Sequence, residues 1–143
     1  MSEHKVLLVD DEVDFVDALA ERLEVRGLEV VKTHSGAEAL QAAEERVFDA
    51  IVLDMAMPEM NGLETLEELL KINPDLQVIL LTGRATLEQA AAAIRIGALD
   101  LLEKPAEIST LVSKIEQAAT RRWSLEQQRI EERVADLIRR KGW

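Results

Sequence analysis

Acidic, hydroxyl and amine side chains follow the apolar runs of this sequence in an order that suits a shared site. Asp10 and Asp11 come directly after the first apolar run, Asp54 ends the most apolar one, Thr82 ends the next, and Lys104 lies in or near the end of the last. Carboxylate oxygens without nitrogen or sulfur ligands favour a hard cation such as Mg²⁺. Because carboxylates that lie together repel one another, they also require a cation, and Lys104 can supply that charge.

Each of these residues also has a simpler interpretation. Aspartates at the end of a strand, such as Asp10 and Asp11, commonly begin a turn or cap a helix. Thr82 can cap the helix that follows it, and Lys104 can be a solvated loop lysine. Asp54 is the hardest to explain in this way, because it is not needed to begin the next helix. The occurrence of all of them at one predicted rim favours a functional site.

The elements that must position these residues alternate between two periods. Apolar runs without polar alternation, rich in Val, Ile and Leu, are typical of strands that are buried on both faces of a parallel sheet. They occupy residues 6–9, 50–53 and 78–81, with weaker candidates at 29–33 and 99–102. Apolar residues at helical spacing lie between them: Val16, Leu19, Ala20 and Leu23; Leu40, Ala43 and Val47; Leu63, Leu66 and Leu70; Leu87, Ala90, Ala91 and Ile94; Ile108, Leu111, Val112 and Ile115.

This alternation predicts an α/β fold, a doubly wound five-stranded parallel sheet with helices on both faces. Gly27 and Gly97 follow predicted helices, where a left-handed C-cap is expected. In open sheets of this kind, ligands bind beyond the carboxyl ends of the strands. The residues that end the strands are therefore the ones expected to form the site.

Composition excludes several classes of protein. The 143 residues include 28 acids and 17 bases, a net charge of −11, which argues against binding nucleic acid over the whole surface. The absence of cysteine excludes disulfides and thiol chemistry, and two histidines, His4 and His34, make a histidine-rich zinc site improbable. No apolar run is long enough for a signal peptide or for membrane insertion, so we expect a cytoplasmic protein.

Four stretches of the sequence, taken in order, resemble one known family. They are VLLVDDE at residues 6–12, IVLDMAMPEMNG at 51–62, LLTG at 80–83 and EKP at 103–105. They look like the receiver domain of bacterial two-component response regulators, the CheY-like family, over about residues 4–120. The resemblance implies a flavodoxin-like sheet with strand order 2-1-3-4-5. It also implies a phosphorylation-controlled signalling switch.

In this family the resemblance assigns a role to each rim residue. Asp54 would accept a phosphoryl group from a sensor histidine kinase or a phosphotransfer protein, Lys104 would contact the phosphoryl oxygens, and the Thr82 hydroxyl would move to meet them. Asp11 and Asp54 would hold Mg²⁺ with the backbone carbonyl of Met55, and Asp10 would support the metal through water. A carboxylate is a suitable phosphoryl acceptor when its charge is offset. The protein would then assist its own phosphorylation and dephosphorylation without being an enzyme for another substrate.

Two positions depart from the family pattern. Leu101 stands three residues before Lys104, where the family usually has an aromatic switch residue, so no ring is expected there to couple to Thr82. Ala56, two residues after Asp54, has no group to orient attacking water, which favours slower loss of the phosphoryl group. Ala56 also counts against a haloacid-dehalogenase-like phosphatase, whose second Asp would stand there.

Two further classes of protein fit the sequence less well than a receiver domain does. No glycine-rich phosphate loop follows any strand, which argues against a nucleotide-binding protein. A dimerisation scaffold that signals without phosphate would not need the complete set of acids, Thr82 and Lys104, but the sequence leaves it open.

The last 23 residues differ from the rest of the chain. Residues 1–120 carry a net charge of −14, whereas residues 121–143 carry +3. Because 23 residues are too few for a DNA-binding domain, we expect a receiver domain at 1–120 with a helical extension at 121–143 and no separate output domain. It would act on a downstream protein target, without direct contact to nucleic acid. The alternative is a fragment of a longer transcriptional regulator.

The extension is predicted to continue the last helix. No Gly or Pro interrupts the chain between Glu107 and Gly142. Trp123, Ile130 and Leu137 recur every seven residues, with Val134 beside them and Gln127 at one position of the seam. Such a stripe needs a partner. It either folds back on the acidic domain or, as we expect, forms a homodimer.

Overall fold

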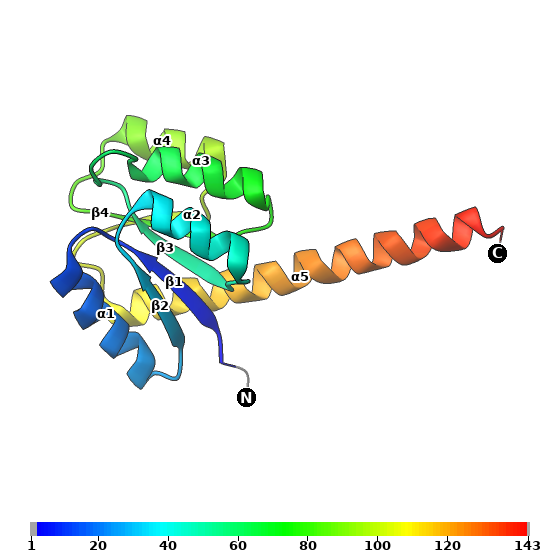
Figure 1. Cartoon of the computed structure of the whole chain (residues 1–143), viewed down its shortest axis with the longest axis horizontal. Helices are drawn as coiled ribbons and strands as arrows, with labels where there is room; N and C mark the ends of the chain where they lie inside the picture. Colours follow the sequence, from blue (N-terminus) through cyan, green and yellow to red (C-terminus); the bar gives the residue numbers. More distant parts are fainter. Residues whose placement is uncertain (1–2, 143) are drawn as a thin grey trace.

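The computed structural model describes residues 3–142. Residues 1–2 of the predicted receiver domain and residue 143 of the predicted extension lie outside the described residues. Five parallel strands form one sheet in the order β2-β1-β3-β4-β5, as predicted. The helices α1 and α5 cover one face and α2, α3 and α4 cover the other (Figure 1). The strands are β1 (Lys5–Val9), β2 (Glu29–Thr33), β3 (Ala50–Asp54), β4 (Val78–Thr82) and β5 (Asp100–Glu103); the helices are α1 (Val13–Val25), α2 (Gly36–Glu45), α3 (Gly62–Ile72), α4 (Leu87–Ile96) and α5 (Ile108–Arg140).

The apolar runs form the central strands because they are buried on both sides. Every residue of β3 and β4 is buried, and alternate side chains enter the two cores on opposite faces of the sheet. The register places Val9 of β1 beside Leu53, Asp54 beside Leu81, and Thr82 beside Glu103. The three strands that carry candidate site residues therefore end at nearly the same level.

Side-chain caps determine where the helices begin on that side of the sheet. Ser35 accepts a hydrogen bond from the Glu38 N–H at the start of α2. Asn61 and Thr86 form reciprocal capping boxes at the starts of α3 and α4. At the other end of α1 and α4, Gly27 and Gly97 take positive φ angles, 86° and 126°, as predicted for C-caps.

Two predicted helix faces were wrong. Val47 was expected on the apolar face of the second helix, but α2 ends at Glu45 and the Val47 side chain is exposed. The fourth helix was expected to bury Leu87 and Ile94. Instead α4 packs through Ala93, while Leu87 is 87% exposed and Ile94 54%. In an alanine-rich helix several faces are apolar, so spacing alone does not select the buried one.

The last helix is continuous, as predicted, and extends well beyond the sheet (Figure 1). It does not fold back on the domain. Two ion pairs tie its first extended turns to loops at the amino ends of the strands. Arg122 Nη1 lies 3.0 Å from Asp49 Oδ1, and Arg129 donates through both Nε and Nη2 to the Asp75 carboxylate. The basic extension and the acidic domain are thus joined by specific contacts.

Sequence spacing along the extension allows Glu126 to pair with Arg122, Arg129 or Arg133, and the structure shows one of these pairs. Arg122 also lies 3.8 Å from Glu126, one turn along the helix, whereas Arg129 binds Asp75 instead of Glu126. Among residues 3–142, no helix combines the length and the apolar character that crossing a membrane requires.

Replacing Asp75 with Asn should loosen α5 from the domain. The hydrogen bond from Arg129 holds the pKa of Asp75 below its usual value, so this contribution to stability is present at neutral pH and is lost as the pH falls below about 4. We expect Asp75→Asn to lower the thermal midpoint at pH 7, measured by circular dichroism, with the difference from wild type shrinking toward pH 3.

Asp136→Asn is the matched control, because within residues 3–142 Asp136 pairs only with Arg139 and Arg140 of the same helix. It should change the midpoint less at pH 7. An Asp75→Asn effect of equal size at both pH values would contradict a contribution from the ionised carboxylate.

Candidate functional site

The candidate site lies where β1, β3 and β4 end. Asp10 directly follows β1, and Asp54 and Thr82 are the last residues of β3 and β4. All three are buried, with exposures of 3%, 5% and 4%. Lys104 follows β5, and its backbone N–H donates to the Thr82 carbonyl at 2.7 Å. The fold therefore brings together side chains that are 94 residues apart in sequence, such as Asp10 and Lys104.

The Lys104 ammonium is the cation at the centre of this site. Its Nζ lies 2.7 Å from Asp10 Oδ2 and 3.3 Å from Asp54 Oδ1. Glu12, whose side chain is largely exposed, adds a carboxylate at 3.6 Å. The ammonium also lies 4.2 Å from the centre of the Phe15 ring, a cation–π contact. Lys104 thus contacts both buried carboxylates, and the Phe15 ring of α1 packs against its ammonium group.

Burial and like charge make Asp54 an unusual carboxyl group. Burial raises the pKa of Asp54, and the neighbouring Asp10 carboxylate raises it further, while Lys104 opposes both effects. Burial alone would lower the pKa of Lys104, but its hydrogen bond with Asp10 and its attraction to both aspartates raise it overall. The ionised state of Asp54 therefore depends on a nearby positive charge.

The carboxylates fit a divalent metal ion by the chemistry of their donor atoms. Asp10, Asp11 and Asp54 each place one carboxylate oxygen within 4.8 Å of the others. Asp11 is exposed, so the cluster is open to solvent on its side. An all-oxygen donor set that leaves room for water suits Mg²⁺. The residues predicted from the sequence as carboxylate ligands are the ones that the structure brings together.

The predicted fourth ligand, the Met55 carbonyl, already has a partner. It accepts a hydrogen bond from the Gly62 N–H at 2.9 Å. A Cβ atom at position 62 would lie 2.5 Å from Met55 Cα and 2.6 Å from the Asp54 carbonyl oxygen, so only glycine allows α3 to begin there. This close contact holds the segment after Asp54 in place. The second lone pair of the Met55 carbonyl remains a predicted ligand.

The Thr82 hydroxyl is hydrogen-bonded to Arg84 and not to Asp54. Its Oγ1 donates to the Arg84 carbonyl and accepts from the Arg84 N–H, both at 3.2 Å, which closes a tight turn after β4. Leu101, at the position of the family's aromatic switch, is half-buried and packs against the core on the α2–α4 side of the sheet. No ring therefore stands at that position to follow a movement of Thr82.

Sequence reasoning missed two contacts of the site. Phe15 lies in the first turn of α1, and its ring contacts the Lys104 ammonium. The Nδ1 atom of His34 lies 3.1 Å from the Asp10 carbonyl oxygen. His34 directly follows the last residue of β2, so its position at a strand end is a signal that could have found it. Phe15 also carries a signal, because it is an aromatic residue that lies close after two strand-end aspartates and outside the predicted face of the helix.

Comparison with known proteins identifies the family to which this chain belongs. The family model of the response regulator receiver domain matches residues 6–116, which is most of the chain. The chain belongs to this family. Residues 6–116 are thus a receiver domain of the two-component response regulators, as the sequence motifs indicated.

Relatives of this receiver domain include longer proteins. The transcriptional regulatory protein ZraR of Escherichia coli (strain K12) is 35% identical over 121 residues, which cover 85% of this chain and 27% of ZraR. The chain therefore spans about a quarter of the length of that relative.

Two solved structures show how closely the fold is shared. A CheY-like receiver domain protein from Methanospirillum hungatei JF-1 has a TM-score of 0.81 and 30% identity, and the match covers 86% of this chain and 98% of that chain. A response regulator from Burkholderia pseudomallei has a TM-score of 0.75 and 26% identity, covering 98% of this chain and 86% of that chain. The Burkholderia structure contains a phosphorylated aspartic acid, a calcium ion and citrate.

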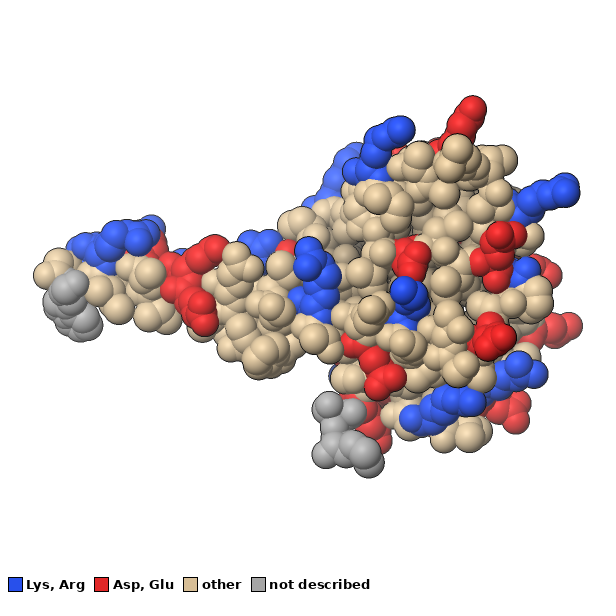
Figure 2. Space-filling view, turned by 180° about the vertical axis from the view of Figure 1, so that it is seen from behind, with Lys and Arg blue, Asp and Glu red and all other residues tan. Residues whose placement is uncertain are grey.

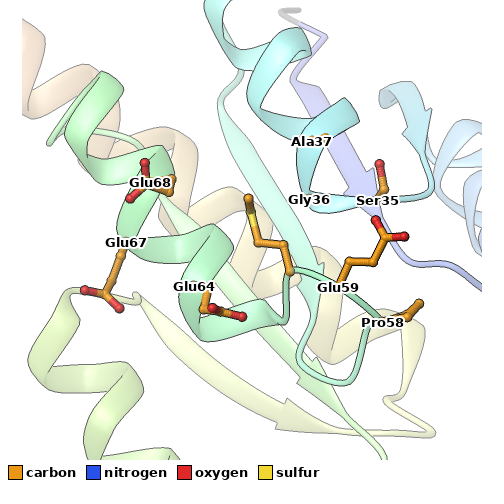
Figure 3. A pocket seen from close by; sticks show the side chains of 9 residues that line it. Ser35, Gly36, Ala37, Pro58, Glu59, Glu64, Glu67 and Glu68 are labelled. Atoms are coloured by element: carbon orange, nitrogen blue, oxygen red, sulfur yellow. The ribbon is translucent and has the colours of Figure 1, made fainter.

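A separate hollow of about 530 Å³ lies between the start of α2 and α3 (Figure 3). It is lined by Ser35 and Gly36 on one side and by several glutamates of the β3–α3 loop and α3 on the other. Glu64 is already used in the cap of α3. The hollow shares no lining residue with the strand-end site, and we assign no chemistry to it.

Because Lys104 contacts two of the carboxylates that would hold a metal ion, its charge should oppose metal binding. We expect Lys104→Met to tighten Mg²⁺ binding by about fivefold, measured by isothermal titration calorimetry. Lys114→Met is the matched control, because Lys114 pairs with Asp100 on the last strand, outside the site. Unchanged Mg²⁺ affinity in Lys104→Met would show that the ammonium and the metal do not compete.

Proposed function

We propose that this receiver domain accepts a phosphoryl group on Asp54 from a sensor histidine kinase or a phosphotransfer protein. The observation that carries the proposal is the buried Asp54 carboxylate, which ends the central strand 3.3 Å from the Lys104 ammonium and beside two further aspartates. An Asp54 oxygen attacks the phosphorus atom, the bond between phosphorus and the donor histidine nitrogen breaks, and that nitrogen keeps the electron pair. The product is an aspartyl phosphate.

Each neighbour of Asp54 has a distinct task in this step. Asp10 and Asp11, together with Asp54, are the residues that would hold Mg²⁺, with the Met55 carbonyl as the predicted fourth ligand. When it is bound, Mg²⁺ supplies positive charge that offsets the phosphoryl oxygens. Lys104 reaches the same oxygens after its contact with Asp54 is broken. Its attachment to Asp10 and Phe15 keeps the ammonium close during the change.

Thr82 would carry the signal away from the site. For its hydroxyl to meet the phosphoryl group, both hydrogen bonds to Arg84 must break, so the turn between β4 and α4 must change shape. That turn leads into α4, whose exposed Leu87 begins the helix. We propose that the rearranged turn presents this region to a downstream protein target. Leu101 then acts only as a packing residue.

The remaining assignments follow from this role. Residues 1–120 form the receiver domain and residues 121–143 its helical extension, through which two copies self-associate. The domain is a phosphoacceptor that assists its own phosphorylation and dephosphorylation, and it has no other substrate. Because the sensor kinase would take its phosphoryl group from ATP in the cytoplasm, we also place this receiver domain in the cytoplasm. Because the chain spans about a quarter of ZraR, the second candidate is the receiver part of a longer transcriptional regulator.

Intact-mass spectrometry after incubation with acetyl phosphate and Mg²⁺ tests the acceptor. The wild-type chain should gain one phosphoryl group, and Asp54→Asn should reduce uptake by about hundredfold or more, because no other carboxylate ends the central strand. Asp100→Asn, which alters an aspartate of β5 outside the metal cluster, is the control and should be phosphorylated normally.

Two outcomes would contradict the proposal. Phosphoryl uptake by Asp54→Asn at Asp10 or Asp11 would show that the acceptor is assigned wrongly. No uptake by the wild-type chain would favour the phosphate-independent scaffold.

A further inference from the structure

The α5 extension carries an apolar stripe that the described structure leaves about half exposed. Trp123, Ile130, Val134 and Leu137 lie on one side of the helix with exposures of 62%, 50%, 49% and 40%. Their spacing of seven, four and three residues is that of a helix seam that packs against another helix. Beyond its contacts with the domain the extension projects outward, and uncharged surface lies between groups of charged side chains along it (Figure 2).

Beside this stripe the domain and the extension form a groove of about 420 Å³. Val47 and Leu76 line it from the domain, and Ile130, Val134 and Arg133 line it from the helix. The Val47 side chain, left exposed after the end of α2, is therefore part of a second apolar wall. The groove is large enough for an indole ring, but the Trp123 of the same chain does not line it.

We propose that two copies of this chain pair their α5 extensions antiparallel, so that Trp123 of each copy packs on Val134 and fills the groove of the other. This rests on the self-association proposed above and specifies its geometry. In this register, Ile130 of one copy lies opposite Gln127 of the other.

Charge selects this arrangement among those that the seam allows. Glu126 and Arg133 flank the seam on the same side, and the antiparallel register brings Glu126 of each copy beside Arg133 of the other, twice by symmetry. A parallel pair would instead place Glu126 beside Glu131 of the other copy. An antiparallel pair shifted by one heptad would oppose Arg133 to itself and Glu131 to itself.

Arg133 is available for this contact. The ion pairs of the extension use Arg122, Arg129, Arg139 and Arg140, and Arg133 has none within residues 3–142. It lies at the rim of the groove, where a carboxylate from a second copy would meet it. Glu126 has a long contact of 3.8 Å with Arg122 of its own helix, which leaves it free to turn outward.

The proposed geometry differs from a dimer through the side of α5 that lies next to Leu99. On that side, Leu99 of the domain and Gln117, Arg121 and Ser124 of α5 line a different hollow. At 100° per residue, these α5 residues lie roughly a third of a turn from the stripe. The proposed interface therefore leaves the α4 and β5 side of the receiver domain uncovered.

Sedimentation equilibrium of the full chain tests the pairing by charge reversal. The wild type should form a dimer. Glu126→Arg and Arg133→Glu should each raise the dimer dissociation constant by about tenfold, and the double variant should restore it, because the pair is reversed but intact. Arg133→Glu places a carboxylate one turn from Arg129 but also one turn from Asp136, so circular dichroism of each variant must show unchanged helix content. Glu132→Arg, on the far face of the helix, is the control and should dimerise as wild type does.

The contrary outcomes are distinct. A wild-type chain that stays monomeric at every concentration overturns the proposal. Tighter association of Glu126→Arg also overturns it, because only the parallel pair gains from an arginine beside Glu131. Each variant is also phosphorylated with acetyl phosphate and measured by mass, and should take up phosphate as wild type does. Failure of that reaction in all chains would refute the acceptor role while leaving the dimer result standing.

Discussion

The structure depends on a single buried arrangement of charge, the Lys104 ammonium between the carboxylates of Asp10 and Asp54. Two carboxylates that are about 95% buried and close together cannot both be ionised without a cation near them. Lys104 provides this charge at 2.7 Å and 3.3 Å. A lysine that holds a site together in this way is also the group that must be released when another cation or a phosphoryl group arrives. Stability and function therefore use the same contacts.

The rest of the fold maintains this arrangement. Parallel strands in register bring the ends of β1, β3 and β4 to one edge, and the burial of every residue of β3 and β4 disfavours a shift of register. Gly62 lets α3 begin against the backbone of Asp54 and Met55, which fixes the carboxylate at its base. The Phe15 ring, in the first turn of α1, contacts the Lys104 ammonium. The strand ends and Gly62 lie in the stretches that resemble the family, whereas Phe15 lies outside them.

Much of this could be predicted from the sequence because parallel sheets leave strong local signals. The strands were recognisable from continuous apolar runs, and the rim residues from the polar side chains that end those runs. The face of α4 was not, because its alanines make several faces equally apolar. The Phe15 contact and the clamp between Asp75 and Arg129 were also missed. Both join residues far apart in the chain, and neither has a pattern that reveals its partner.

The central claim is that Asp54 and Lys104 are energetically coupled, and a double-mutant cycle measures this most directly. The free energy of unfolding in urea is compared at pH 7 without Mg²⁺ for wild type, Asp54→Asn, Lys104→Met and the double variant. We expect Lys104→Met to cost about 2 kcal/mol in the wild-type background and about 1 kcal/mol less in the Asp54→Asn background, where one of the two carboxylates no longer needs a cation. An equal cost in both backgrounds would contradict the account.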